Sequence, residues 1–228
     1  SGSDAVIHVE GTDAPDEEVL TLGVVELIPK SIKKWITISD EVLDMKDEEF
    51  IDYVYDELGH KIAKAAADIV VAKIKALPQT SSATTPAAAK ITEAPSATTM
   101  VNAIANLSDE ATNNVAIMNK LTWAAFKSIT TGDGYPLADP FAGLVVLFNN
   151  SLKSYDAAAE GEVYAIVGDL ATGFRANFPN GEEIRIKMDD LSLAEADLVK
   201  FVGRKYVALE AVAPGRFTLI AKPAATEP

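Results

Sequence analysis

The chain has 228 residues, a formal net charge of −14 and 48% hydrophobic residues, which is the composition of a folded globular protein. It contains no cysteine, which excludes disulfide bonds and thiolate metal or redox sites. Its 34 acidic and 20 basic side chains argue against strong nucleic-acid binding, because that binding depends on Lys and Arg neutralising phosphates. No segment has the roughly 20 apolar residues of a membrane span, and the start lacks the apolar core of a signal peptide, so we expect no membrane partner.

The first part of the chain predicts mostly β structure. Residues 4–18 combine a short alternating strand with an acidic loop. Residues 21–39 are rich in β-branched side chains and predict strand structure that is broken near Pro29. Ser39 is suited to cap a short helix over residues 40–45.

A long amphipathic helix is predicted over residues 47–77. Lys73 and Lys75 lie in its last turn, where the helix dipole favours cations, and Pro78 ends it. At 1.5 Å per residue such a helix is about 45 Å long, which favours a flattened or elongated body over a compact one. Its apolar stripe recurs every fourth residue, at Phe50, Val54, Leu58 and Ile62.

Residues 78–99 are rich in Ala, Ser, Thr and Pro and predict a connection between two structural units. Beyond them helical and alternating patterns follow one another, so the fold class is a mixed α+β one. The predicted helices cover 99–107, 121–129 and 191–202, and the predicted strands cover 114–119, 143–150, 163–167, 173–176 and 183–188, with two more around a Pro214–Gly215 turn.

The residue types that bind metals or phosphates are present, but they do not have the spacing that a metal site or a phosphate site requires. His8 and His60 are the only histidines, and neither has a second histidine at metal-ligand distance, so each is interpreted as solvated or packed. The acidic run at residues 13–18 lacks the spacing of a calcium loop. The Gly-Asp-Gly triplet at residues 132–134 has no Gly-Lys-Ser/Thr after it and predicts a tight turn. We therefore expect no metal and no cofactor.

Catalytic constellations are equally lacking. Asp169, Asp189 and Asp190 could form paired carboxylates for acid–base work, but nothing in the sequence places them in one cleft. Trp35 and Trp123 lie in apolar periodic stretches and are interpreted as core residues instead of binding platforms. No Gly-x-Ser-x-Gly elbow occurs, so we expect no catalytic residue and no enzyme activity.

Five segments, in this order, resemble segments of the major capsid proteins of tailed bacteriophages. The likeness runs from Val24 to Ala221. The segments are VVELIPKSIKKWITISDEVLDM with the long helix after it, NVAIMNKLTWAAFKSITTGDGYPLADP, GLVVLFNN, VYAIVGDLATGFRA, and FVGRKYVALEAVAPGRFTLI.

The resemblance implies a flat wedge with a long spine helix, a peripheral-domain sheet and an axial domain with a central sheet. It also implies an E-loop, which is a hairpin that reaches over a neighbouring subunit, with residues 4–23 as its returning strand. The implied divisions are an E-loop remnant at 1–23, a peripheral domain at 24–89 plus 173–222 with the spine helix at 47–77, an axial domain at 90–172, and a tail at 223–228.

The function implied by the resemblance is structural. The chain would self-assemble into pentamers and hexamers of an icosahedral head, in the virion, after assembly in the host bacterial cytoplasm. The shell would enclose DNA with weak or no specific binding, which suits an acidic protein. Asp133, Tyr135 and Asp139 of the axial loop are the expected inter-subunit contacts at a symmetry axis.

Two departures from the family pattern stand out. The sequence starts within the E-loop, so we expect the N-terminal arm to be missing and the hairpin to be incomplete. Some members cross-link an E-loop lysine to an asparagine of a neighbour. The first lysine here is Lys30, beyond the hairpin, so the sequence gives no support for that cross-link.

Two other hypotheses remain. One is a shell protein of a bacterial nanocompartment of the encapsulin type, which shares the fold but encloses cargo enzymes. The other is an α/β enzyme or small-ligand-binding module, which predicts a compact globule with a concave pocket and convergent polar groups. The capsid hypothesis predicts an elongated wedge with apolar side chains exposed for protein contacts.

Overall fold

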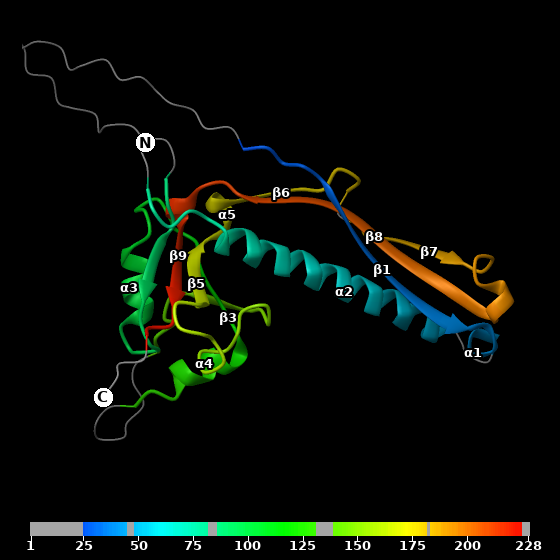
Figure 1. Ribbon diagram of the computed structural model, residues 1–228, viewed down its shortest axis with the longest axis horizontal. Helices are drawn as coiled ribbons and strands as arrows, with labels where there is room; N and C mark the ends of the chain where they lie inside the picture. Colours follow the sequence, from blue (N-terminus) through cyan, green and yellow to red (C-terminus); the bar gives the residue numbers. More distant parts are fainter. Residues whose placement is uncertain (1–24, 45–47, 82–85, 131–138, 182, 225–228) are drawn as a thin grey trace, which may run out of the picture.

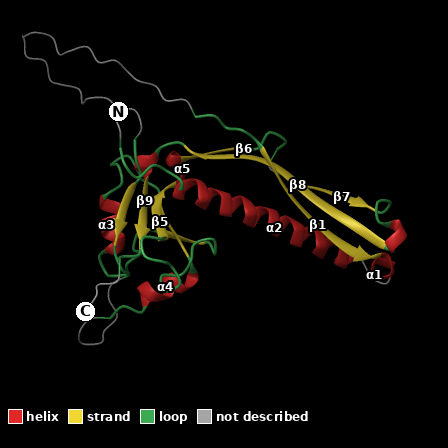
Figure 2. Cartoon of the chain, viewed as in Figure 1, coloured by secondary structure: helices red, strands yellow, loops and turns green. Residues whose placement is uncertain are grey.

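The computed structural model describes residues 25–44, 48–81, 86–130, 139–181 and 183–224. The chain forms two β-sheets joined by a long helix, in an elongated body with one sheet at each end (Figure 1). Helices and strands both contribute extensively, as the predicted α+β class requires (Figure 2). The predicted E-loop remnant, and Asp133 and Tyr135 of the axial loop, lie outside the described residues.

A four-stranded antiparallel sheet is built around the 14-residue strand β8 (Leu198–Ala211). Strand β1 (Lys30–Ser39) pairs with the first ten residues of β8 and begins directly after Pro29. The strand structure predicted before Pro29 is absent from residues 25–29. On the other side of β8 lie β7 (Arg185–Asp189) and β6 (Phe174–Asn177), one after the other. Strand β8 is therefore the centre of this sheet.

The long helix α2 (Glu48–Lys75) covers one face of the four-stranded sheet and is about 42 Å long. The short helix α1 (Asp40–Asp44) precedes it, so both helices predicted in this region are confirmed. Leu58 of α2 is fully buried against Phe201 of β8. A Cβ placed on Gly203 of β8 would lie 2.8 Å from the Cδ1 atom of Ile62, so this glycine lets the helix approach the strand closely.

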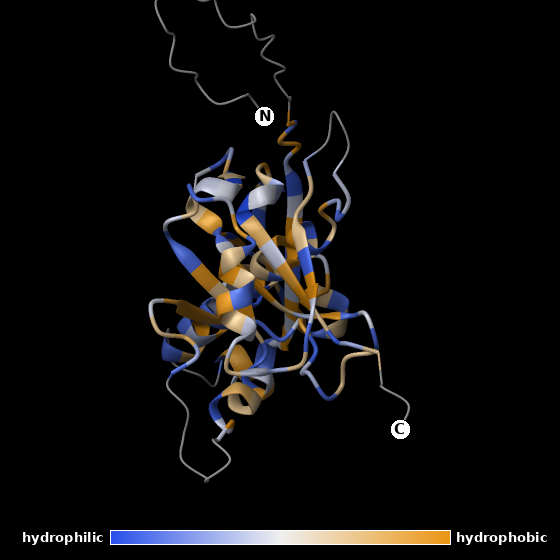
Figure 3. Cartoon of the chain, turned by 90° about the vertical axis from the view of Figure 1, so that its left-hand side faces the viewer, coloured by the Kyte–Doolittle hydropathy of each residue, from blue (hydrophilic) through white to orange (hydrophobic). Residues whose placement is uncertain are grey.

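The five-stranded sheet forms the other end of the molecule, with strand order β2-β9-β5-β3-β4. Hydrophobic residues lie along these strands, and the surrounding loops are more hydrophilic (Figure 3). The central strand β5 is antiparallel to both neighbours, whereas the outer pairs β2–β9 and β3–β4 are parallel. The strands are β2 (Ala89–Thr92), β3 (Asn114–Met118), β4 (Val145–Phe148), β5 (Val163–Asp169) and β9 (Phe217–Ala221), and the helices beside them are α3 (Thr99–Ala105) and α4 (Lys120–Lys127).

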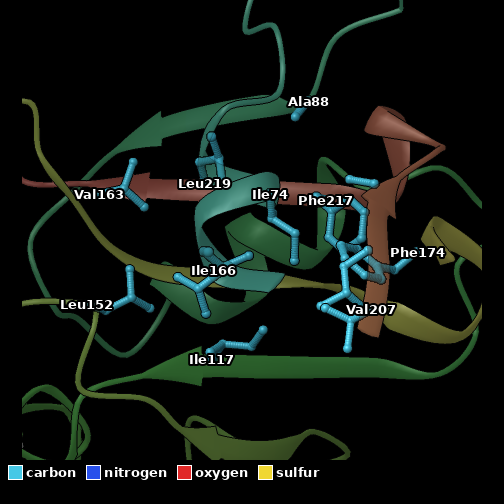
Figure 4. Close-up of a cluster of buried hydrophobic side chains, with 13 residues drawn as sticks. Ile74, Ala88, Ile117, Leu152, Val163, Ile166, Phe174, Val207, Phe217 and Leu219 are labelled. Carbon is cyan, nitrogen blue, oxygen red and sulfur yellow. The ribbon is translucent and has the colours of Figure 1, made fainter. Parts of the chain in front are cut away.

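The carboxyl-terminal end of α2 enters the core of the five-stranded sheet. Ile74 is fully buried among side chains that come from both sheets (Figure 4). Leu219 of β9 and Ile166 of β5 lie beside it, and Val207 of β8 contributes from the four-stranded sheet. The two sheets therefore share a hydrophobic cluster at this end of the helix.

The predicted helix over residues 191–202 is wrong. The structure has only a single turn of 3-10 helix at Ala194–Ala196, and Asp197 then takes a left-handed conformation with φ 51°. From Leu198 onward the chain is strand, with Val199 and Phe201 buried at alternate positions. Pairing with β1 and β7 on its two sides overrides the helical propensity of the sequence.

The last two strands are present as predicted, but they do not pair with each other. After the Pro214–Arg216 turn, β9 joins the five-stranded sheet between β2 and β5. The predicted division placed residues 217–221 in the peripheral domain together with β8. In the structure, β9 and β8 belong to different sheets. Strand β2 was not predicted, since it lies within the segment interpreted as a connection.

The chain crosses from one sheet to the other through a Gly-Asp pair at the end of β5. One short helical turn, α5 (Leu170–Gly173), follows the pair and leads into β6. A Cβ on Gly168 would collide with the carbonyl oxygen of Arg216 and lie 2.5 Å from Cδ1 of Phe217. A Cβ on Gly173 would lie 2.7 Å from Cε2 of the same Phe217 ring. Only glycine fits at these two positions while the start of β9 packs this closely.

Asp169 fixes the backbone at this crossing. Its carboxylate is fully buried and accepts hydrogen bonds from the backbone N–H groups of Ala171 at 2.9 Å and Thr172 at 3.3 Å. Its second oxygen accepts from the N–H groups of Thr112 at 3.3 Å and Asn113 at 3.4 Å. Burial raises the pKa of Asp169, but the hydrogen bonds from Thr172, Asn113 and Ala171 outweigh it and hold the pKa below its ordinary value. The group is a structural cap.

Replacing Gly168 by Ala should destabilise the fold by about 2 kcal/mol, because the new methyl group meets backbone atoms that cannot move aside. Chemical denaturation monitored by tryptophan fluorescence measures the effect. Gly215→Ala is the matched control, since no atom lies within 4 Å of a Cβ built there. Equal stability of the two variants would contradict the packing described.

Asp169→Asn should destabilise the protein by about 2 kcal/mol at pH 7, because an amide NH₂ replaces an acceptor oxygen facing N–H donors. Because the folded pKa of Asp169 is depressed, its contribution is complete above the unfolded pKa of about 3.9 and is lost as the pH falls through the folded pKa. The stability gap between wild type and variant should therefore shrink below about pH 4. The exposed Asp190→Asn is the control, and a gap independent of pH would refute the assignment.

Candidate assembly surfaces

The structure does not bring the candidate catalytic carboxylates together. Asp169 ends β5 in the five-stranded sheet, whereas Asp189 ends β7 at the opposite end of the molecule (Figure 1). Asp189 accepts a hydrogen bond from the Ser192 hydroxyl at 2.6 Å and from the Ser192 backbone N–H at 3.0 Å. These bonds from Ser192 hold the pKa of Asp189 below its ordinary value. Both aspartates therefore stabilise turns.

Within the described ranges, no group of three or more His, Asp or Glu side chains could hold a metal ion. His60 is exposed on α2. A hollow beside the carboxyl-terminal half of α2 contains two charged side chains, Asp68 and Lys75. The other residues that line it are uncharged: Val71, Ala72, Ala76 and Ser151. None of the described helices is both long and apolar enough to cross a membrane.

Asp139 is the one predicted axis contact that the structure describes. Its carboxylate forms an ion pair with Lys127 of α4 at 2.6 Å and accepts a hydrogen bond from the Phe141 N–H at 3.0 Å. The Lys127 contact, followed by the Phe141 hydrogen bond, lowers the pKa of Asp139. Phe141 packs edge-to-face on Phe126 of α4 in the core. Asp139 therefore ties the start of the described range 139–181 to α4.

The two tryptophans differ from each other. Trp123 of α4 packs against the core of the five-stranded sheet and meets Phe148 edge-to-face, in agreement with the prediction. Trp35 of β1 is 57% exposed, so its assignment to the core is wrong. The strand alternation places Trp35 on the face of the sheet away from α2, where Lys200 lies 5.3 Å from the ring centroid.

An apolar strand edge is the most prominent candidate contact surface of the described residues. Strand β4 lies at the edge of the five-stranded sheet, and β3 is the one strand it pairs with among the described residues. Val145 is 61% exposed, Phe148 is 47% exposed, and Leu147 between them is also exposed. We call these three residues the β4 edge patch. An exposed edge strand presents both unpaired backbone groups and apolar side chains to a partner.

The sequence did not reveal the β4 edge patch. The run Val-Val-Leu-Phe at residues 145–148 is continuously apolar, which is typical of a strand buried on both faces. Only the strand order shows that β4 has a neighbour on one side. Helix α2 adds a further exposed apolar side chain, Tyr53.

The fold is shared with shell proteins of known structure. The chain superimposes on "Capsid of native GTA particle computed with C5 symmetry" with a TM-score of 0.69 and 16% identity, over 86% of this chain and 73% of the other. It matches a structure from Gordonia phage Cozz with a TM-score of 0.61 and 14% identity, over 98% and 79% of the two chains. A virus-like particle from Pyrococcus furiosus gives a TM-score of 0.60 and 14% identity, over 84% and 75%.

At these identities the structural likeness establishes the fold alone. No curated protein sequence matches the chain. The family model described as "Phage capsid family" matches residues 1–221, which is nearly the full length. The two sheets joined by a long helix agree with that match. The chain belongs to the phage capsid family.

Proposed function

We propose that this chain is the major shell subunit of a phage-type head, which self-assembles into pentamers and hexamers of an icosahedral particle that encloses DNA. Its place is the virion, after assembly in the host cytoplasm, and its role is structural and not enzymatic. The observation that carries the proposal is the unpaired apolar edge of the five-stranded sheet on an elongated body. Such an edge needs a neighbouring chain to cover it.

Closed symmetric assembly explains how contacts of modest strength can hold a stable particle together. Each subunit of a ring presents the same two surfaces, so every contact is repeated around the axis and the ring closes. The repetition adds many contacts of ordinary strength into one stable particle. In this scheme the β4 edge patch contributes the apolar part of one repeated contact.

The division into domains follows from the same proposal. The four-stranded sheet with α2 would form the peripheral domain, and the five-stranded sheet would form most of the axial domain. Residues 131–138, which include Asp133 and Tyr135, would then approach the symmetry axis. The ion pair of Asp139 with Lys127 joins the residue after this segment to α4.

A nanocompartment shell is the second candidate, because the Pyrococcus furiosus virus-like particle shares the fold. The capsid of the native GTA particle superimposes better, with a TM-score of 0.69 against 0.60. The two functions differ in what the particle contains. Nuclease-protected DNA in purified particles supports a phage-type head, whereas particles that hold a protein cargo and no nucleic acid support a nanocompartment.

Self-assembly itself is tested by size-exclusion chromatography with multi-angle light scattering, followed by negative-stain electron microscopy. We expect rings of five or six subunits, or closed shells, in equilibrium with free subunits. A monomer that persists at every concentration and ionic strength would contradict the proposal.

Charging the β4 edge patch should abolish assembly without unfolding the subunit. In Val145→Glu/Leu147→Glu the two new carboxylates would be buried unpaired in the contact, whereas in the free subunit they face water. We expect loss of the assembled peak in light scattering and a change in unfolding free energy within about 0.5 kcal/mol. Ala63→Glu/Ala67→Glu, at exposed positions of α2, adds the same charge elsewhere. Equal assembly of both variants would exclude the β4 edge patch as a contact.

A further inference from the structure

One asparagine of the chain is followed by a glycine. The sequence contains nine asparagines, and Asn180 is the one that precedes a glycine, Gly181. The carboxamide of an asparagine is open to attack by the backbone nitrogen of the next residue, and a side chain on that next residue hinders the approach. Glycine has no side chain and a freer backbone. The sequence therefore distinguishes Asn180 from every other asparagine of the chain.

Asn180 lies in a tight turn that follows β6. The Gly181 N–H donates to the Phe178 carbonyl oxygen at 2.9 Å, which closes a β-turn over residues 178–181. Pro179 occupies the second position of the turn, where proline is favoured, and Gly181 takes a left-handed conformation with φ 84°. The φ of Asn180 is not positive, which excludes a type II turn and agrees with type I.

The groups that would react are open to solvent. Pro179, Asn180 and Gly181 are all exposed, and no atom lies within 4 Å of a Cβ built on Gly181. Within the described part of the chain, the side-chain amide of Asn180 has no hydrogen-bond partner that would hold it away from the backbone. The side chain of Asn102, by contrast, donates to the Glu93 carboxylate at 2.9 Å.

We propose that Asn180 is a site of spontaneous deamidation, at which the chain modifies itself without an enzyme. The backbone nitrogen of Gly181 loses its proton to hydroxide and attacks the side-chain Cγ of Asn180. A new C–N bond forms, the C–N bond of the carboxamide breaks, and the leaving group takes a proton from water and departs as ammonia. Water then opens the cyclic imide at either carbonyl carbon, which gives aspartate or isoaspartate. No oxidant or reductant takes part.

The hydrogen bond of the turn controls access to this reaction. The attacking nitrogen of Gly181 is the atom whose N–H donates to Phe178, so that bond must open before the proton is lost. Phe178 packs against the hydrophobic cluster that both sheets share, and the Lys205 ammonium lies 4.6 Å from its ring centroid. These contacts favour the closed turn. The folded chain should therefore react more slowly than a peptide of the same sequence, and both should react faster as the pH rises.

The two products change the turn in different ways. Aspartate adds a negative charge and leaves the path of the backbone unchanged. Isoaspartate also carries the backbone through its own Cβ, which lengthens the chain between the Phe178 carbonyl and the Gly181 N–H and breaks the fit of their hydrogen bond. The purified isoaspartate form should therefore unfold at a lower denaturant concentration than Asn180→Asp. Equal midpoints would contradict the role given to the turn.

The site is tested by incubating the full chain at mildly alkaline pH and mapping its proteolytic peptides by mass spectrometry. We expect Asn180 to convert to aspartate and isoaspartate with uptake of ¹⁸O from labelled water. Asn177 is the internal control, because it is exposed in the same region but precedes Phe178, and it should remain an amide. Equal conversion at the two positions would overturn the proposal. So would an intact Asn180 under conditions that fully convert a peptide of residues 174–183.

Product composition and one variant test the route. Direct hydrolysis of the carboxamide by water gives aspartate alone, so a product without isoaspartate would refute the attack by Gly181. In Asn180→Gln the side chain is longer by a methylene group, and attack by the Gly181 nitrogen would have to close a larger ring. We expect this variant to show no conversion over the time in which the wild type converts. Conversion of the variant at the wild-type rate would overturn the proposal.

Discussion

The burial of one helix face under two different sheets is the constraint on which the rest of this structure depends. Near its start, α2 packs Leu58 against Phe201 of the four-stranded sheet. Near its end, it packs Ile74 against Leu219 of the five-stranded sheet. Because the helix is continuous between these points, it sets the separation of the sheets and produces an elongated body (Figure 1).

This architecture leaves surfaces uncovered. Helix α2 covers one face of the four-stranded sheet, and the other face exposes Trp35. The five-stranded sheet ends in β4, whose apolar side chains are exposed. A subunit that acts alone normally covers or charges such edges. A subunit that assembles can leave them for its neighbours, and this is the physical link between the fold and a shell.

The β4 edge patch would contribute to the proposed shell by apolar burial. Affinity from such burial changes little with salt. Gly168, Gly173 and the capping carboxylate of Asp169 fix the position of the two sheets relative to each other.

The sequence by itself determined the local elements and the absence of a recognisable catalytic pattern. The four-residue period of α2 and the strands β1, β5 and β7 were predicted correctly, because each depends on neighbouring residues. Tertiary structure alone decided that residues 198–202 form a strand and that β9 and β8 belong to different sheets. It also decided that Trp35 is exposed and that β4 is an edge strand. It also aligned Lys33, Arg185 and Arg204 in one row. These features depend on which distant strands pair, and local patterns of polarity do not specify a pairing partner.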